Sequence, residues 1–229
     1  MHIFAAFRLL VFTGCFLFIC ETSEEDHRLY FYQPLCGNGD EHEITYSLEN
    51  YPPQTTMTFE EVRDQLDISF GAWTRASNNS LRFVPAASKE TAHIVVSFKE
   101  GKHKCVRSPC LVTEAFPESN HVLAHTFNPS GGSEVHMNAR VLWLKSCDDL
   151  QTNHYDYGHE INYAVLNEIL THEIGHAIGI KHLKGENTIM HSGYAACSGM
   201  APSIGPLDFH VMAMIARYCD QHAHRHKLP

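Results

Sequence analysis

The sequence has little positive charge, no internal repeat and few long apolar runs. Its 229 residues include 17 Lys and Arg against 26 Asp and Glu, a formal net charge of −9. This balance argues against a nucleic-acid-binding surface, which clusters Lys and Arg, and the lack of any period argues against a repeat architecture. Beyond residue 22 there is no long apolar run, so we expect no membrane span in the mature chain. With 44% hydrophobic residues, the chain is long enough for one well-packed soluble domain.

The first 22 residues are typical of a secretory signal peptide. Arg8 ends a short positive region, and Leu9–Ile19 is an apolar run broken only by a Thr-Gly pair. This run is too short for a comfortable membrane span. We expect cleavage between Cys20 and Ser23, with an uncleaved N-terminal anchor as the alternative. The prediction is therefore a secreted, extracellular protein.

Cysteine usage also indicates an oxidising compartment. Of the eight cysteines, Cys15 and Cys20 are expected to leave with the signal peptide. The six that remain are Cys36, Cys105, Cys110, Cys147, Cys197 and Cys219. Six cysteines in a secretory chain predict three disulfides, with fifteen connectivities open and Cys105–Cys110 the most local pairing.

The sequon Asn78-Asn79-Ser80 predicts a glycan on Asn78.

The stretch from Thr171 to His182, T-H-E-I-G-H-A-I-G-I-K-H, carries the chemistry. His172 and His176 are four residues apart, so on a helix they share one face and can reach one metal ion. Gly179 can take the left-handed conformation that ends a helix, which turns the chain back and lets His182 supply a third nitrogen. Three neutral ligands with an open fourth position are typical of a catalytic zinc site.

Glu173 is the expected general base. It follows the first His ligand and can lie beside the metal without binding it. Zinc lowers the pKa of bound water from 15.7 to about 7, and Glu173 would take the proton of that water. The alternative is a helix with surface histidines and a C-cap glycine. It is disfavoured because Met190, eight residues after His182 in T-I-M-H-S-G-Y, resembles the Met-turn of the metzincin peptidases, although a lone methionine is more often core filler.

The rest of the pattern predicts an α+β domain over residues 43–220, between a short N-terminal segment (23–42) and a His-rich tail (221–229). The expected strands are Glu43–Leu48, Leu81–Val84, His93–Phe98, Val122–Phe127 and Glu134–Trp143. The expected helices are Thr58–Ala76, Ala164–Ala177 and about Leu207–Asp220. A T-x-x-E capping box opens the first helix. Its predicted core face is Phe59, Val62, Leu66, Phe70 and Trp73.

The motifs resemble the catalytic domain of the matrixins, the matrix metalloproteinase family of metzincin zinc endopeptidases, over about Glu43–Tyr218. The anchors are I-T-Y-S-L-E-N-Y, V-L-A-H-T-F, the zinc motif, and a methionine with Tyr194 four residues later. The step from His182 to Met190 fits matrixins and is too short for astacin-like enzymes. The resemblance implies a twisted, mostly parallel sheet of about five strands, three helices, and a zinc cleft beneath an edge strand.

By this resemblance the protein is a secreted zinc-dependent endopeptidase that acts on extracellular proteins, including those of the extracellular matrix. His172, His176 and His182 would bind the catalytic zinc, Glu173 would be the general base, and Met190 would form the Met-turn beneath the metal. Substrates would bind in extended conformation to a monomeric enzyme. The alternative is a catalytically silent extracellular binding module on the same fold. The intact ligands and Glu173 argue against it.

The resemblance also assigns two residues to the substrate pocket. Tyr194 would lie at the pocket for the side chain after the scissile bond, and the residue four before the first zinc His partly sets the pocket's depth. That residue is Glu168, an acid where the family often has an apolar residue, which predicts a bias toward basic or polar side chains. Alternatively, Glu168 turns to solvent or pairs with a Lys.

A second, structural zinc is also implied, because matrixins hold one with three His and one Asp. His103, His125 and His136 stand in matching contexts, while Cys105 replaces the Asp. Zinc accepts thiolates readily, so a site with three His and one Cys is one expectation and a Cys105–Cys110 disulfide is the alternative. The acidic residues that hold calcium in matrixins are largely missing, so we predict no strong calcium dependence.

The stretch P-L-C-G-N-G-D around Cys36 is similar to the matrixin cysteine switch, in which a propeptide thiolate takes the open position on the zinc. That interpretation makes Cys36 a zinc ligand in a latent form. The shortness of the segment weighs against it, as does the odd number of mature cysteines that it would leave. The alternative is a disulfide from Cys36, for example to Cys219 near the other end of the domain.

Overall fold

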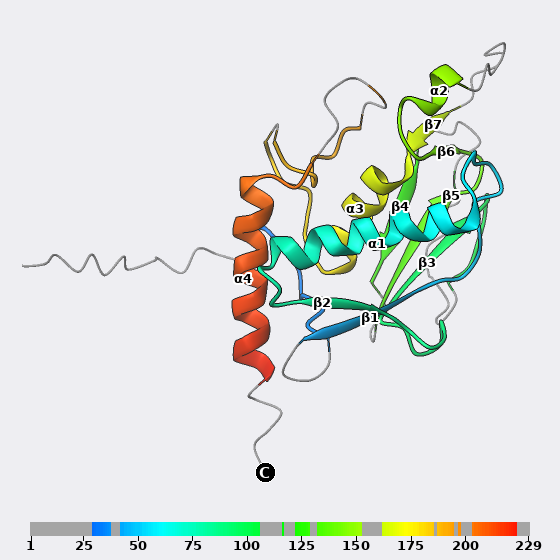
Figure 1. The fold of residues 1–229 in the computed structure, drawn as a ribbon. Helices are drawn as coiled ribbons and strands as arrows, with labels where there is room; N and C mark the ends of the chain where they lie inside the picture. The colour runs from blue at the N-terminus through cyan, green and yellow to red at the C-terminus, as the bar shows by residue number, and fades with distance from the viewer. Residues whose placement is uncertain are drawn as a thin grey trace, which may run out of the picture.

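A computed structural model describes residues 29–37, 42–105, 116, 122–128, 132–152, 162–185, 187–194, 197 and 203–223. These residues form three helices of 12 to 18 residues, one four-residue helix, a five-stranded sheet and a separate two-stranded sheet (Figure 1). This is the α+β architecture that the sequence predicts. The predicted signal peptide, Cys110 and most of the predicted His-rich tail lie outside the described residues.

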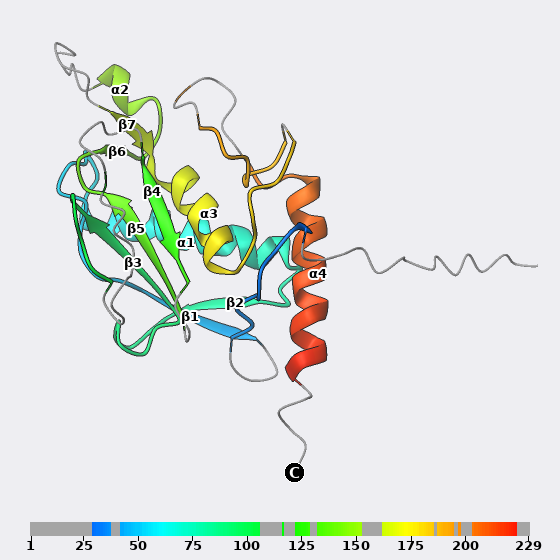
Figure 2. The same ribbon diagram turned by 180° about the vertical axis from the view of Figure 1, so that it is seen from behind.

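The large sheet has the strand order β2-β1-β3-β5-β4. Its strands are β1 (Glu43–Leu48), β2 (Arg82–Pro85), β3 (Ile94–Lys99), β4 (Ala124–Phe127) and β5 (Ser133–Asn138). All neighbouring pairs are parallel except β4 and β5, which are antiparallel. Residues of β3 are buried on both faces, as its continuous apolar run predicts. The last strand in the order, β4, is half-buried and forms the edge beside helix α3, Leu166–Ala177 (Figure 2).

Helix α1 (Phe59–Ala76) begins at the predicted capping box. Thr58 Oγ1 accepts a hydrogen bond from the Glu61 N–H, and the Glu61 carboxylate accepts one from the Thr58 N–H. The buried face includes Val62, Leu66, Phe70 and Trp73, as predicted. The prediction for Phe59 is wrong. Its side chain is 52% exposed and stacks on Tyr51, because the first residue of the helix lies beyond the core.

Helix α3 (Leu166–Ala177) packs against α1, and α4 (Pro206–Ala223) crosses the end of α1 (Figure 1). Trp73 Nε1 of α1 donates a hydrogen bond to the Thr171 carbonyl of α3, 2.8 Å away. This buried bond fixes α3 against the longer helix α1. None of the helices in the described ranges is long and apolar enough to cross a membrane.

Two segments differ from the predicted elements. The strand expected over Glu134–Trp143 is broken by a turn at Ala139 and Arg140, where the Arg140 N–H donates to Asn138 Oδ1. After the turn, β6 (Leu142–Leu144) pairs in parallel with β7 (Tyr163–Val165), and α2 (Asp149–Thr152) lies between them in sequence. Helix α3 therefore begins at Leu166 and not at the predicted Ala164, since the apolar residues before it form strand β7.

Residues 29–37 pack against the domain. Phe31 is 2% exposed and forms an antiparallel bridge with Ile180. The Tyr32 N–H donates to the Gly179 carbonyl at 2.8 Å, just after the end of α3. A disulfide then joins Cys36 to Cys219 of α4. The described part of the predicted N-terminal segment thus contributes to the core.

Candidate metal centres and active site

Three histidines converge at the end of α3. His182 Nε2 lies 3.3 Å from His172 Nε2 and 3.1 Å from His176 Nε2. Nitrogen atoms that bind one tetrahedral zinc at 2.0–2.1 Å lie about 3.3–3.4 Å apart, so these three are spaced for a single ion. Gly179 has φ +105° and ends the helix as predicted. A Cβ added there would lie 3.1 Å from Pro34 Cα, so the packed N-terminal segment also requires glycine.

Backbone carbonyls orient two of these imidazoles. His172 Nδ1 donates to the Ile189 carbonyl and His176 Nδ1 donates to the Ile180 carbonyl, each at 2.7 Å. Because a carbonyl only accepts, the proton is on Nδ1 and the Nε2 lone pair faces the other histidines. Burial lowers the pKa of both rings, to about 4 for His176, so both are neutral at pH 7. Converging lone pairs repel one another unless a cation lies between them, which indicates a metal site.

Met190 packs against helix α3 at Gly175. Its side chain is fully buried, and a Cβ added at Gly175 of α3 would collide with it. The Met190 carbonyl also accepts a hydrogen bond from the Leu183 N–H at 2.9 Å. The turn at Met190 therefore supports both the helix that carries two histidines and the chain just after the third.

Asp208 is a residue that the sequence analysis missed. It is fully buried in the first turn of α4. Its carboxylate accepts hydrogen bonds from the Thr188 hydroxyl, the Ile189 N–H and the Gly205 N–H. Since the Ile189 carbonyl accepts a hydrogen bond from His172 Nδ1, Asp208 stabilises the segment that orients His172. An acidic residue in the first turn of a helix is too common to have indicated this role.

Glu173 lies on α3 between the two helical histidines and is 6% exposed. Burial raises the pKa of its carboxyl to about 7, and a hydrogen bond from Thr126 opposes the rise. The Thr126 hydroxyl lies 2.7 Å from Glu173 Oε2. A cation bound nearby would lower this pKa by stabilising the carboxylate. The acid is thus held against strand β4 by Thr126, a partner that the sequence did not suggest.

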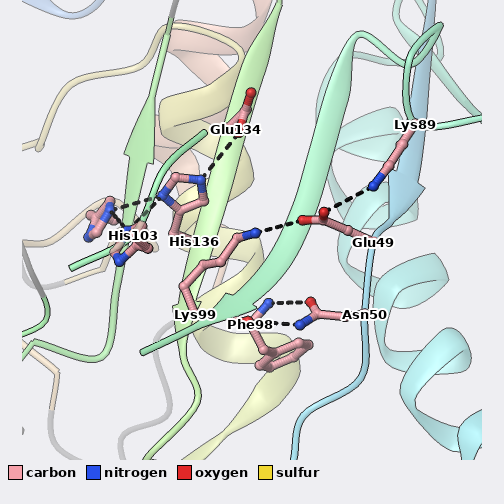
Figure 3. Close-up of polar contacts among 9 residues, drawn as sticks. Glu49, Asn50, Lys89, Phe98, Lys99, His103, Glu134 and His136 are labelled. Carbon is pink, nitrogen blue, oxygen red and sulfur yellow. Dashed lines mark hydrogen bonds and ion pairs between the residues drawn. The ribbon is translucent and has the colours of Figure 1, made fainter. Parts of the chain in front are cut away.

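A second group of three histidines lies against the sheet (Figure 3). His103 Nε2 lies 3.2 Å from His125 Nε2 and 3.1 Å from His136 Nδ1, and the latter two atoms are 3.1 Å apart. His125 and His136 are directly opposite each other on β4 and β5. His136 Nε2 donates to the Glu134 carboxylate and His103 Nδ1 to the Gly101 carbonyl. His136 Nδ1 and His103 Nε2, which face the centre of the group, therefore carry lone pairs, as the Nε2 atoms of His172 and His176 do.

Comparison with known proteins decides the family. The family model for matrixin matches residues 38–213. The chain belongs to the matrixin family. It is 30% identical over 162 residues to a probable matrix metalloproteinase of Invertebrate iridescent virus 3, and 28% identical over 178 residues to the interstitial collagenase of Sus scrofa. These alignments cover 69% and 71% of this chain but 38% and 32% of the relatives, so the chain spans about a third of the length of the curated relatives it matches.

Two predicted cysteine ligands of this matrixin are disulfide-bonded. Cys36 Sγ is bonded to Cys219, so interpreting Cys36 as a zinc-binding switch is wrong and the disulfide alternative holds. The fold explains this pairing, because it brings the two Cα atoms to 5.2 Å from each other. Cys105 is also in a disulfide, so it offers no thiolate to the second group of histidines. A further disulfide joins Cys147 to Cys197.

The two predicted pocket residues of this matrixin are in contact. The Tyr194 hydroxyl donates to Glu168 Oε2 at 2.8 Å and accepts from the Val165 N–H at 3.1 Å. Burial raises the pKa of the Glu168 carboxyl, and the hydrogen bond from Tyr194 opposes the rise. Glu168 therefore pairs with Tyr194, not with a Lys. Asn78 is exposed in the turn after α1 with φ +53°, where a glycan has room.

Proposed function

We propose that this matrixin is a secreted zinc endopeptidase that hydrolyses peptide bonds of extracellular proteins. The observation that supports it best is the convergence of three histidine Nε2 atoms on one point, with a buried acid, Glu173, next to His172 on the same helix. Three neutral ligands with a free fourth position suit a catalytic zinc better than a structural one. The protein-cleaving relatives and the disulfides are consistent with an extracellular peptidase.

In this mechanism the chain's own residues hold the metal, orient the histidines and move a proton. Zinc, when bound, polarises the substrate carbonyl and lowers the pKa of the attacking water. Glu173 accepts the proton of that water and passes it to the departing amine. The carbonyls of Ile180 and Ile189 keep the proton of each helical imidazole on Nδ1. The edge strand β4 is available to pair with an extended substrate as an added strand.

A cleavage assay tests this function. Purified protein should cleave a quenched generic protein substrate, a zinc chelator should abolish the cleavage, and added zinc should restore it. Activity that survives complete zinc removal would contradict the zinc mechanism. If the zinc-loaded protein cleaves nothing, the chain is better explained as a catalytically silent extracellular binding module.

We also propose that His103, His125 and His136 hold a second zinc. Their facing nitrogens are as closely spaced as those of the first group, and the Glu134 carboxylate orients His136 in the way that outer carboxylates orient zinc-bound histidines. Metal analysis of the purified protein counts the ions. The two-zinc proposal fails if wild type and His136→Ala bind the same number.

Glu168 should give the pocket a preference for basic side chains after the scissile bond. Glu168→Gln should lower the ratio of kcat/KM for a lysine peptide to that for a leucine peptide by about tenfold, since about 1.4 kcal/mol of charge attraction is lost. Because burial raises the pKa of Glu168, the carboxylate forms only above that raised value. The wild-type ratio should therefore rise with pH, whereas the ratio for Glu168→Gln should stay flat.

Tyr194 is the titratable group that faces Glu168, and because burial raises its own pKa it stays neutral throughout this pH range. Glu90→Gln changes an exposed acid and is the matched control, which should leave the ratio unchanged. An ordinary leucine preference in the wild type at every pH would rule out a role for Glu168 in specificity.

A further inference from the structure

Three side chains attach the edge strand β4 and the start of β5 to the C-terminal half of the zinc helix. The pairs are Thr126 Oγ1 with the Glu173 carbonyl (3.0 Å), Asn128 Nδ2 with the His176 carbonyl (3.1 Å), and Ser133 Oγ with the Ala177 carbonyl (2.8 Å). The last carbonyls of a helix lack intrahelical partners. The bonds from Asn128 and Ser133 are therefore ordinary structural anchors.

Thr126 differs from the other two because its hydroxyl also reaches a side chain. Thr126 Oγ1 lies 2.7 Å from Glu173 Oε2 and 3.0 Å from the Glu173 carbonyl oxygen. A hydroxyl has one proton and donates to one of these acceptors at a time. The shorter contact, to a carboxylate, is the stronger hydrogen bond when the acid is ionised. This contact holds Oε2, one of the two carboxylate oxygens, against strand β4.

We propose that Thr126 is a positioning residue for the general base, an inference that rests on the proposed peptidase function. A glutamate side chain has several rotatable bonds, and a buried carboxylate must point in one direction to accept a proton efficiently. Thr126 belongs to strand β4, so the strand backbone holds its hydroxyl beside Glu173. The Thr126 hydroxyl therefore selects the orientation in which Glu173 faces the cleft.

The place of Thr126 on β4 adds a second consequence. Successive side chains of a strand point to opposite faces. His125 accordingly faces His136 and the second group of histidines, while Thr126 faces Glu173. The strand that would pair with substrate is thus tied on one face to the second metal centre and on the other face to the general base.

Kinetic measurements on full-length variants test this role. Thr126→Val keeps the size of the side chain and removes the hydroxyl, and it should lower kcat by about tenfold to a hundredfold, the usual effect of losing one hydrogen bond to a charged group. The KM and the zinc content should stay within about twofold of wild type. Thr126→Ser should restore kcat, because serine supplies the same hydroxyl.

Ser133→Ala is the matched control, because it removes an anchor to the same helix that does not touch Glu173. It should lower the thermal stability as Thr126→Val does but leave kcat near that of wild type. In a Glu173→Gln background, Thr126→Val should cause little further loss, since the two residues act as one unit. Equal kcat in Thr126→Val and Ser133→Ala, or no rescue by serine, overturns the proposal.

A spectroscopic measurement separates this inference from the proposed function. The ¹³C resonance of the Glu173 carboxyl can be assigned by its loss in Glu173→Gln. At fixed pH it should shift in Thr126→Val and not in Ser133→Ala, whether or not the protein cleaves peptides. A shift in a protein without peptidase activity supports the positioning contact while the proposed function fails. An unshifted resonance means that Thr126 does not position Glu173.

Discussion

Replacing Glu173 with Gln should lower kcat/KM for peptide cleavage by about a hundredfold to ten-thousandfold, the usual contribution of a general base. The amide has nearly the shape of the carboxylate but cannot accept the proton of the attacking water. Glu173 Oε2 is bound by Thr126, while the converging metal-site nitrogens belong to the histidines. Zinc content should therefore be unchanged in the variant.

The variant should also fold normally. Glu173 is buried, and burial disfavours its charged form, so exchanging the acid for an amide removes a desolvation cost. The Thr126 hydroxyl can donate to the amide oxygen as it does to the carboxylate. Steady-state kinetics, metal analysis and thermal unfolding measure the three expectations, with Glu100→Gln as an exposed control. If Glu173→Gln loses zinc, Glu173 is itself a zinc ligand. If the variant keeps a kcat/KM within tenfold of wild type, Glu173 is not the general base.

The second large effect concerns the disulfide between Cys36 and Cys219. Replacing both with Ser should lower the free energy of unfolding by about 2–5 kcal/mol, because this bond closes a very long loop in the unfolded chain. The sequence separation is 183 residues, against 50 for Cys147–Cys197. The Cys147→Ser/Cys197→Ser variant is the matched control, with a smaller expected loss from loop closure.

Denaturant unfolding without reductant measures both losses. The same variants test the cysteine-switch interpretation a second time. If Cys36 blocked the zinc as a free thiol, the Cys36→Ser/Cys219→Ser variant would have a higher specific activity than the freshly purified wild type. With Cys36 in the disulfide, we expect a less stable protein whose activity per folded molecule equals that of wild type. A clear rise in specific activity would show instead that Cys36 blocks the zinc as a free thiol.

Short-range patterns predicted the part of the structure that depends on neighbours in sequence. The capping box at Thr58 and the helix end at Gly179 each involve residues within one or two turns, so spacing alone was enough. The same holds for His172 and His176, four residues apart on one helix. The apolar run before α3 was ambiguous, because a short run of this kind fits a buried strand as well as a helix, and it forms β7.

Contacts between distant segments could not be predicted from the sequence. Thr126 and Glu173 are 47 residues apart, and Asp208 and Ile189 are 19 apart, and each pair meets only because strands and helices pack in this way. The three histidines of the second group were found by resemblance to a family and not by their spacing. For Cys36 the sequence left a thiol and a disulfide equally open, since only the folded chain brings Cys219 beside it.

The bond between Cys36 and Cys219 has a practical consequence for any study of maturation. It makes a covalent ring of the chain between these residues, which contains the zinc helix and both groups of histidines. One proteolytic cut inside a ring opens it without separating the pieces. A nicked molecule will therefore migrate as a single species on a gel run without reductant and as two fragments once thiol is added, so self-processing would be overlooked unless both gels are compared.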